Sequence, residues 1–93
     1  MNISESTRVV RNEAVPTGEI DGELVALDVE KGDCFGMDRV GATIWKIADS
    51  PRSVGEIADR LVETHDVERS RCLADILPFV GELVEAGLLR RVD

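Results

Sequence analysis

The hydrophobic pattern of the chain changes its period once, at Asp38. Before this residue apolar and polar side chains alternate in short runs separated by Gly, Pro and Asp, which is typical of β-strands and turns. After it apolar side chains recur every three to four residues, as in amphipathic helices. The pattern therefore predicts an α+β fold in which a small sheet precedes a group of helices.

The part before Asp38 predicts three strands, at residues 8–11, 23–29 and 34–37. Consecutive strands usually pair with their neighbours, so we expect a three-stranded antiparallel β-meander. An Asp-Gly pair is among the strongest hairpin signals. The turn sequences that separate the strands lie at residues 15–18, 21–22 and 30–33.

Side-chain alternation assigns faces to the second and third of these strands. Val25, Leu27 and Val29 share one face of the second strand. Phe35 and Met37 point the same way from the third strand, and we expect both in the hydrophobic core. The third strand is the last of the meander, so it is expected at the edge of the sheet.

Two helices are predicted directly after the strands. Asp38 is a suitable N-cap for the first, which ends near Pro51. Ser53 and Glu56 form a capping box that opens the second helix. The apolar positions are Val40, Ile44, Trp45, Ile47 and Ala48 in the first helix, and Val54, Ile57, Ala58, Leu61 and Val62 in the second.

The third helical pattern covers residues 68–86 and contains Pro78. Proline removes a backbone donor and clashes with the preceding turn, at a cost of about 3 kcal/mol inside a regular helix. We therefore expect either a kink or two abutting helices, the second beginning at Pro78. Gly87 is a natural helix stop, and residues 88–92 form a short extended tail. The apolar stripe is Leu73, Ile76, Leu77, Val80, Leu83 and Val84.

A meander followed by three helices is a winged helix-turn-helix-like arrangement, for which fold analogy alone suggests DNA binding. The charge of the chain argues against DNA binding, because the sequence has 11 Lys and Arg but 19 Asp and Glu, and its net charge is −8. Phosphate contacts depend on clustered basic side chains, and so does docking on an anionic membrane surface. We therefore expect no nucleic-acid and no membrane partner.

Length and apolar runs set the expected organisation and location. The 93 residues correspond to one domain covering the whole chain, with residues 1–6 flexible. No apolar run approaches the roughly 18–20 residues that span a bilayer, and no secretory signal is visible. A cytoplasmic protein is the expectation.

Few side chains suit catalysis or metal binding. His65 is the single histidine and falls at the polar end of the second helix, where the dipole favours a solvated cation. Cys34 and Cys72 form no CxxC motif, and we expect both as small, semi-buried apolar residues. No glycine-rich phosphate loop is present. We therefore expect no enzyme, no metal and no cofactor.

An edge strand beside a helix can bind an extended peptide by β-strand addition. Residues 34–37 are the expected edge, and Gly36 within them lets a second backbone approach closely. These residues favour a binding module whose backbone groups form the site.

Several blocks of the sequence resemble the PqqD-like proteins. The resemblance extends over residues 22–89, and the order and spacing of the blocks carry it. The blocks are residues 22–28 (GELVALD), 34–38 (CFGMD), 41–45 (GATIW) and 53–61 (SVGEIADRL), followed by Asp75-Ile76, Phe79-Val80, Leu83 and Gly87-Leu88-Leu89.

The resemblance implies a recognition element, or peptide chaperone, for ribosomally synthesised and post-translationally modified peptides (RiPPs). Members of this family hold the leader of a precursor peptide as an added strand between the third strand and the third helix, and present its core to modifying enzymes. Arg69 and Arg71 are candidates for pairing with acidic leader residues. Carried onto this sequence, the strand side is Cys34, Phe35, Gly36 and Met37, and the helix side is Cys72, Ile76 and Phe79.

The sequence departs from the family pattern in two places. Pro78 interrupts the helix that forms one wall of the groove, and residues 30–33 lack the Pro-Glu-Gly turn of the pyrroloquinoline quinone branch. The chain is more similar to stand-alone members of lasso-peptide pathways. That similarity implies two partners, a leader protease resembling transglutaminases and an ATP-dependent cyclase resembling asparagine synthetases.

Two other functions stay open at this point. One is a winged-helix DNA-binding regulator, and the other is a non-catalytic subunit of an enzyme complex. Binding of a leader peptide, but not of duplex DNA, distinguishes a peptide recognition element from both of these functions.

Overall fold

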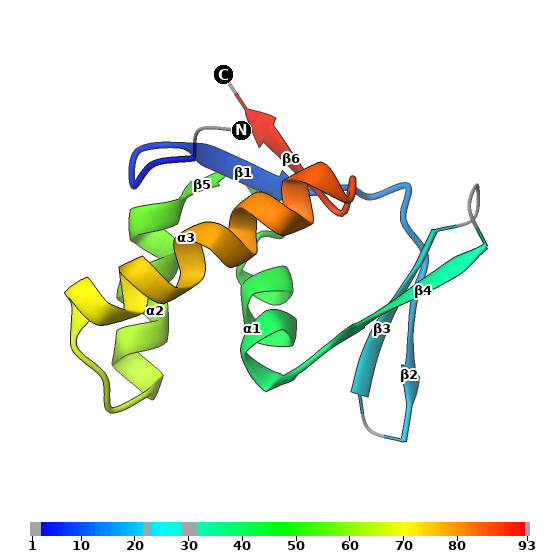
Figure 1. Cartoon of the computed structure of the whole chain (residues 1–93), viewed down its shortest axis with the longest axis horizontal. Helices are drawn as coiled ribbons and strands as arrows, with labels where there is room; N and C mark the ends of the chain where they lie inside the picture. Colours follow the sequence, from blue (N-terminus) through cyan, green and yellow to red (C-terminus); the bar gives the residue numbers. More distant parts are fainter. Residues whose placement is uncertain (1–2, 22, 29–31, 93) are drawn as a thin grey trace.

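The computed structural model describes residues 3–21, 23–28 and 32–92. Figure 1 shows the β2–β3–β4 sheet projecting to one side, α1 beside it, α2 on the far side of α1, and α3 running from α2 across α1. The strands are β1 (Arg8–Arg11), β2 (Thr17–Ile20), β3 (Glu23–Asp28), β4 (Asp33–Met37), β5 (Arg52–Ser53) and β6 (Leu89–Val92); the helices are α1 (Arg39–Ile47), α2 (Val54–Thr64) and α3 (Arg69–Glu85).

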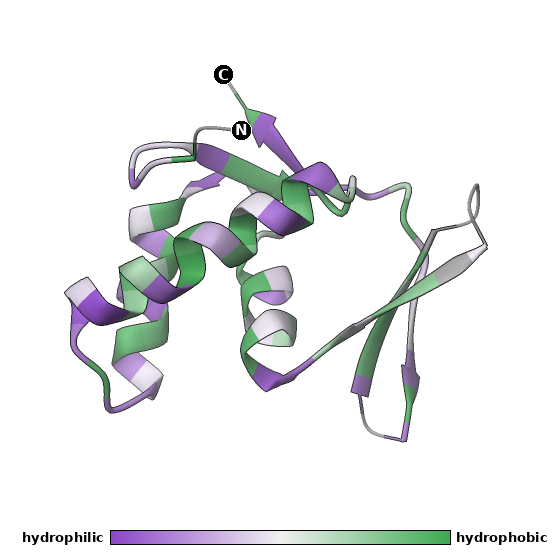
Figure 2. Ribbon diagram, viewed as in Figure 1, coloured by the Kyte–Doolittle hydropathy of each residue, from purple (hydrophilic) through white to green (hydrophobic). Residues whose placement is uncertain are grey.

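A three-stranded antiparallel meander precedes the three helices, which confirms the predicted α+β arrangement. Its first strand, however, is β2, so assigning Thr17 and Gly18 to a turn was wrong. All four residues of β2 are exposed, and the strand therefore lacks the apolar alternation by which a strand is recognised. β2 is a strand because it pairs with β3. The hydrophobic signal lies in β3, most of which is coloured hydrophobic in Figure 2.

The hairpin between β2 and β3 is confirmed by the pairing of Ile20 with Glu23. Asp21 has a φ of 54°, in the left-handed region that type I′ hairpin turns require. Gly22 of the second predicted turn, Val29, and residues 30–31 of the third predicted turn lie outside the described residues.

Residues 8–11 form a strand, as predicted, but in a second sheet of order β5-β1-β6. Their assignment to the meander was wrong. The partners of β1 come much later in the chain, and no local signal announces such pairings. The expected extended tail is β6, which closes this sheet.

Both predicted N-caps are present. The Asp38 carboxylate accepts a hydrogen bond from the Gly41 backbone N–H at 2.8 Å. The Ser53 hydroxyl accepts from the Glu56 N–H, and the Glu56 carboxylate accepts from the Ser53 N–H, which completes the capping box. These bonds supply partners for amide groups that the first turn of each helix leaves free.

The third helix is continuous through Pro78, which excludes the second of the two expected alternatives, a new helix beginning at Pro78. Proline cannot donate to the carbonyl four residues before it, which here belongs to Ala74. Both Ala74 and Pro78 are exposed, so the carbonyl deprived of its partner lies on the solvent side of the helix.

The helix stops where the sequence predicts. Gly87 has a φ of 81°, its N–H donates to Val84 O at 3.0 Å, and the Leu88 N–H donates to Leu83 O at 2.9 Å. This is the Schellman arrangement, and it places Leu88 and β6 against the core.

The hydrophobic core lies among the three helices and is completed by residues from β1, β3, β4 and the start of β6. On β3 the core-facing residue is Ala26, whereas Leu27 is exposed. Val40, one of the apolar positions predicted for the first helix, is 39% exposed and lies outside the core. The buried core residues include Val9, Ala26, Met37, Ile44, Trp45, Ala48, Val54, Ile57, Ala58, Leu61, Ile76, Val80 and Leu83.

Candidate functional site

The strand predicted as an edge, β4, has a paired neighbour on one side only within the described part of the chain. Met37 is 3% exposed, and Phe35 is half-buried against the core, as predicted. Cys34 and Gly36 alternate with them on the opposite face and are exposed. The expectation that Cys34 is semi-buried was therefore wrong, because its face of the sheet is turned away from the core.

One hydrogen bond reveals how the backbone of β3 is oriented. The Leu27 N–H donates to Pro16 O at 2.9 Å, so the backbone groups of Leu27 are turned towards β2. Successive residues of a strand direct these groups to opposite sides. Ala26 is therefore turned towards β4, where it is paired with Phe35.

This orientation decides which backbone groups of β4 lie at the free edge. Phe35 and Met37 direct their N–H and C=O groups inward, to β3. Cys34 and Gly36 direct theirs outward, to the side without a strand neighbour. A Cβ added at Gly36 would meet nothing within 4 Å, so the space on its side of the sheet is open.

Phe79 of α3 lies close to the end of β4. A Cβ built on Gly41 would lie 3.0 Å from Phe79 Cζ and 3.3 Å from Met37 Cβ. Phe79 is half-buried and packs against the core cluster. One flank of α3 is thereby held against the first turn of α1, directly beyond β4.

The other two helix candidates, Cys72 and Ile76, are buried, with 6% and 3% of their surface exposed. They lie one turn apart, so the structure places them on one face of α3, as the spacing predicts. Burial, and then the negative charge of Asp75, raise the pKa of the Cys72 thiol above its ordinary value. A thiol that stays protonated suits an apolar wall and not a nucleophile.

Arg69, one turn before Cys72 on α3, is already paired within the chain. Its Nε donates to Asp59 Oδ1 at 2.6 Å, and its Nη2 donates to Glu5 Oε2 at 2.8 Å. These hydrogen bonds, together with the two carboxylate charges, raise the pKa of Arg69 further above its usual range. The Gly55 N–H also donates to Glu5 O, so the segment before β1 is attached to both α2 and α3.

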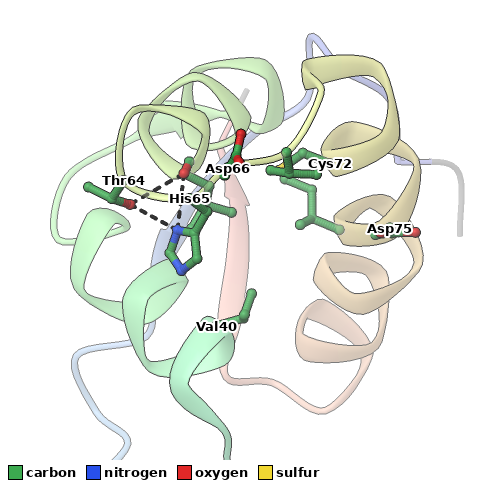
Figure 3. A pocket seen from close by; sticks show the side chains of 9 residues that line it. Val40, Thr64, His65, Asp66, Cys72 and Asp75 are labelled. Carbon is green, nitrogen blue, oxygen red and sulfur yellow. Dashed lines mark hydrogen bonds between the residues drawn. The ribbon is translucent and has the colours of Figure 1, made fainter.

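A pocket of about 600 Å³ opens between α1, the end of α2 and the beginning of α3, and we refer to it as the interhelix pocket. Figure 3 shows Val40 projecting into it from α1 and Cys72 from α3. The His65 Nδ1 is 2.9 Å from Thr64 Oγ1 and 3.1 Å from Leu61 O, which holds the ring in place. The apolar residues that line the pocket are Val40, Leu61, Val67, Cys72 and Ile76, and the polar ones are Thr64, His65, Asp66 and Asp75.

Most of this pocket was not anticipated from the sequence. Cys72 and Ile76 were candidates, but Val40 was predicted only as an apolar position of the first helix and His65 as a solvated helix end. Val40 lies only four residues before the core residue Ile44 and fits the same helical stripe, so the pattern alone does not distinguish them.

The described residues contain neither a metal-binding cluster nor a membrane-spanning helix. No group of three or more His, Cys, Asp and Glu side chains is arranged to hold a metal ion there. In the same residues no helix is both long and apolar enough to cross a bilayer.

The chain matches one family model over residues 23–89, that of the coenzyme PQQ synthesis protein D (PqqD). No curated protein sequence matches it closely.

Three solved structures are similar along most of their length. TbiB1 in complex with the TbiA(beta) leader peptide is 31% identical, with a TM-score of 0.75 over 87% of this chain and 94% of that one. The PqqD truncation of Methylobacterium extorquens PqqCD, a functional and stand-alone RiPP recognition element, is 26% identical, with a TM-score of 0.80 over 97% and 96%. Lasso peptide synthetase B1 complexed with a leader peptide is 23% identical, with a TM-score of 0.76 over 88% and 96%, and supports the fold alone.

Proposed function

Because the chain belongs to the PqqD family, we propose that it is a RiPP recognition element that binds the leader segment of a precursor peptide and delivers it to modifying enzymes. The leader adds to β4 as a further antiparallel strand, beside α3. The protein acts by binding, without catalysis of its own.

The observation that carries this proposal is the free edge of β4. Cys34 and Gly36 present outward-facing N–H and C=O groups there, and such groups pair readily with an extended peptide. Gly36 adds no side chain to its open face of the sheet.

The side chains of the proposed site have a different role from its backbone. Phe35 and Met37 contact the core and hold β4 in its register, and leader side chains on the same face point towards α3. Cys72, Ile76 and Phe79 supply the apolar wall that receives them. Arg69 is left out of the proposed contacts, because its guanidinium is already engaged by Asp59 and Glu5.

The proposed partners follow from the lasso-peptide branch of the resemblance. They are a leader protease resembling transglutaminases and an ATP-dependent cyclase resembling asparagine synthetases. The similarity to TbiB1, a protein solved with a leader peptide, supports binding of a leader. The encounter takes place in the cytoplasm, where precursor peptides are synthesised.

Fluorescence anisotropy with two probes tests the proposal. One is a fluorescein-labelled leader from the precursor peptide encoded beside the gene of this chain, and the other is a labelled DNA duplex. We expect micromolar or tighter binding of the leader and none of the duplex. Absence of leader binding overturns the proposal, and binding of the duplex instead favours the winged-helix regulator.

Gly36→Pro tests the strand-addition mode. Proline removes an N–H that points outward and is tolerated at such edge positions, so the protein should keep its helical circular dichroism. We expect roughly tenfold weaker leader binding, since a lost hydrogen bond with an unpaired partner costs on the order of 1–3 kcal/mol. Gly36→Ala is the matched control: it keeps the N–H, meets nothing within 4 Å, and should bind as the unsubstituted protein does.

A further inference from the structure

The interhelix pocket has an apolar floor that the fold itself leaves open. Val40 lies at its mouth and is one of three large hydrophobic side chains exposed among the described residues. Exposed apolar surface in a concave site gains free energy when another apolar group covers it. The pocket therefore suits an apolar side chain from a partner.

The rim of the pocket is acidic. Asp66 and Asp75 line it, both are exposed, and neither has a salt bridge within the described part of the chain. No lysine or arginine lines the pocket. An incoming segment that carries a lysine or arginine beside its apolar residue therefore matches the charge of this rim.

The other two polar residues that line the pocket, Thr64 and His65, already have hydrogen-bond partners within the chain. His65 Nδ1 and Thr64 Oγ1 contact each other and the Leu61 carbonyl oxygen, as the dashed lines in Figure 3 show. This arrangement forms a preorganised wall, and it leaves the carboxylates as the groups that are free to meet a charge.

The pocket continues the line of the edge strand. Val40 is in the first turn of α1, separated from the end of β4 only by Asp38 and Arg39. A peptide that adds antiparallel to β4 runs from beside Met37 towards Asp33. Residues that precede its paired segment therefore extend past Met37, on the side where Val40 lies.

We propose that the interhelix pocket, which shares Cys72 and Ile76 with the apolar wall of the proposed site, extends that site and receives an apolar side chain, accompanied by a lysine or arginine, from the residues N-terminal to the strand-paired segment. This inference rests on the proposed function. It adds the direction in which the leader runs along β4 and the kinds of leader residue that the pocket receives. The apolar side chain covers the exposed surface of Val40 and Val67, and the basic group pairs with Asp66 or Asp75.

A thermodynamic cycle tests the proposal with the full leader and with a version truncated just before its strand-paired residues. The protein variants are Val40→Ser and, as a matched control, Ile20→Ser, which removes another exposed hydrophobic side chain from β2. We expect truncation to weaken binding roughly tenfold in the unsubstituted protein and in the control. In Val40→Ser both peptides should bind with similar, weakened affinity.

Neutralising the rim separates the charge from the apolar contact. Asp66→Asn with Asp75→Asn should weaken binding of the full leader several-fold at low salt and less at high salt, because salt screens exposed charges. Glu63→Gln with Glu23→Gln changes the net charge equally, at exposed positions outside the pocket, and should have little effect.

The outcomes distinguish this inference from the function on which it rests. If both peptides bind the unsubstituted protein equally well, or if the rim variant and its control behave alike, the pocket assignment is overturned while leader binding stands. If neither peptide binds, the proposed function fails, and the assignment of the pocket fails with it.

Discussion

Phe79 of α3 lies so close to Gly41 of α1 that a Cβ at Gly41 would be 3.0 Å from Phe79 Cζ. Met37 Cβ and Asp38 Oδ1 would lie 3.3 and 3.4 Å from the same position. The absence of a side chain at Gly41 therefore lets the end of β4, the start of α1 and the flank of α3 meet at one point. This contact sets the distance between the edge strand and the helix wall.

A branched side chain at Gly41 should disturb this contact. We expect Gly41→Val to lower the free energy of unfolding by about 1–3 kcal/mol, since overpacking forces side chains and backbone to shift. Urea denaturation measures the change. In a Phe79→Ala background the same substitution should cost at least about 1 kcal/mol less, because the ring is gone. Gly18→Val, where the added Cβ meets nothing within 4 Å, is the control and should not destabilise the protein.

Pro78 stands in a continuous helix at an exposed position, and replacing it should stabilise the protein. Alanine supplies the N–H that can donate to Ala74 O and removes the clash with the preceding turn. The gain is partly offset by the greater freedom of the unfolded chain, so we expect about 1–3 kcal/mol. Thermal denaturation of Pro78→Ala checks this; Pro16→Ala, outside any helix, should show no comparable rise.

The two cysteines should react at very different rates with iodoacetamide. Cys34 is exposed, whereas Cys72 is buried. The pKa of the Cys72 thiol is raised by burial and by Asp75, so less thiolate is present at any given pH near neutrality. Mass spectrometry should find Cys34 modified first and Cys72 only after unfolding in urea. Equal rates in the native protein would contradict the buried placement of Cys72.

Arg69 should act within the chain. Arg69→Gln removes the ion pairs to Glu5 and Asp59, and we expect a small loss of stability that shrinks at high salt, as for other exposed ion pairs. Leader affinity should be unchanged when measured by anisotropy. A large loss of affinity with unchanged stability would instead make Arg69 a peptide contact, as its basic charge alone suggests.

Interactions between residues close in sequence were predictable here. The caps at Asp38 and Ser53, and the helix stop at Gly87, all depend on bonds that span five residues or fewer. The helices follow from the same kind of local periodicity. Phe35 and Met37 were assigned correctly, because alternation in a strand places them on one face together.

Features that depend on distant partners were not predictable in the same way. β1 carries the Val-Val pair of a short strand but no sign of which strands it joins, and β2 carries almost no signal at all. Val40 and Ile44 follow one helical stripe, yet one is exposed and the other buried. Arg69 offers a positive charge, and only the folding of residue 5 against it shows that the charge is already used.

The sequence by itself determined the order of a meander and three helices, their caps, and a composition suited to binding through backbone and apolar groups. The tertiary structure decided which backbone groups of β4 face outward and how α1, α2 and α3 enclose a pocket. The physical reason is range. Caps and periodicity act within a turn or a strand, whereas Cys34, Gly36, Val40 and Asp75 acquire their roles through neighbours that only folding brings together.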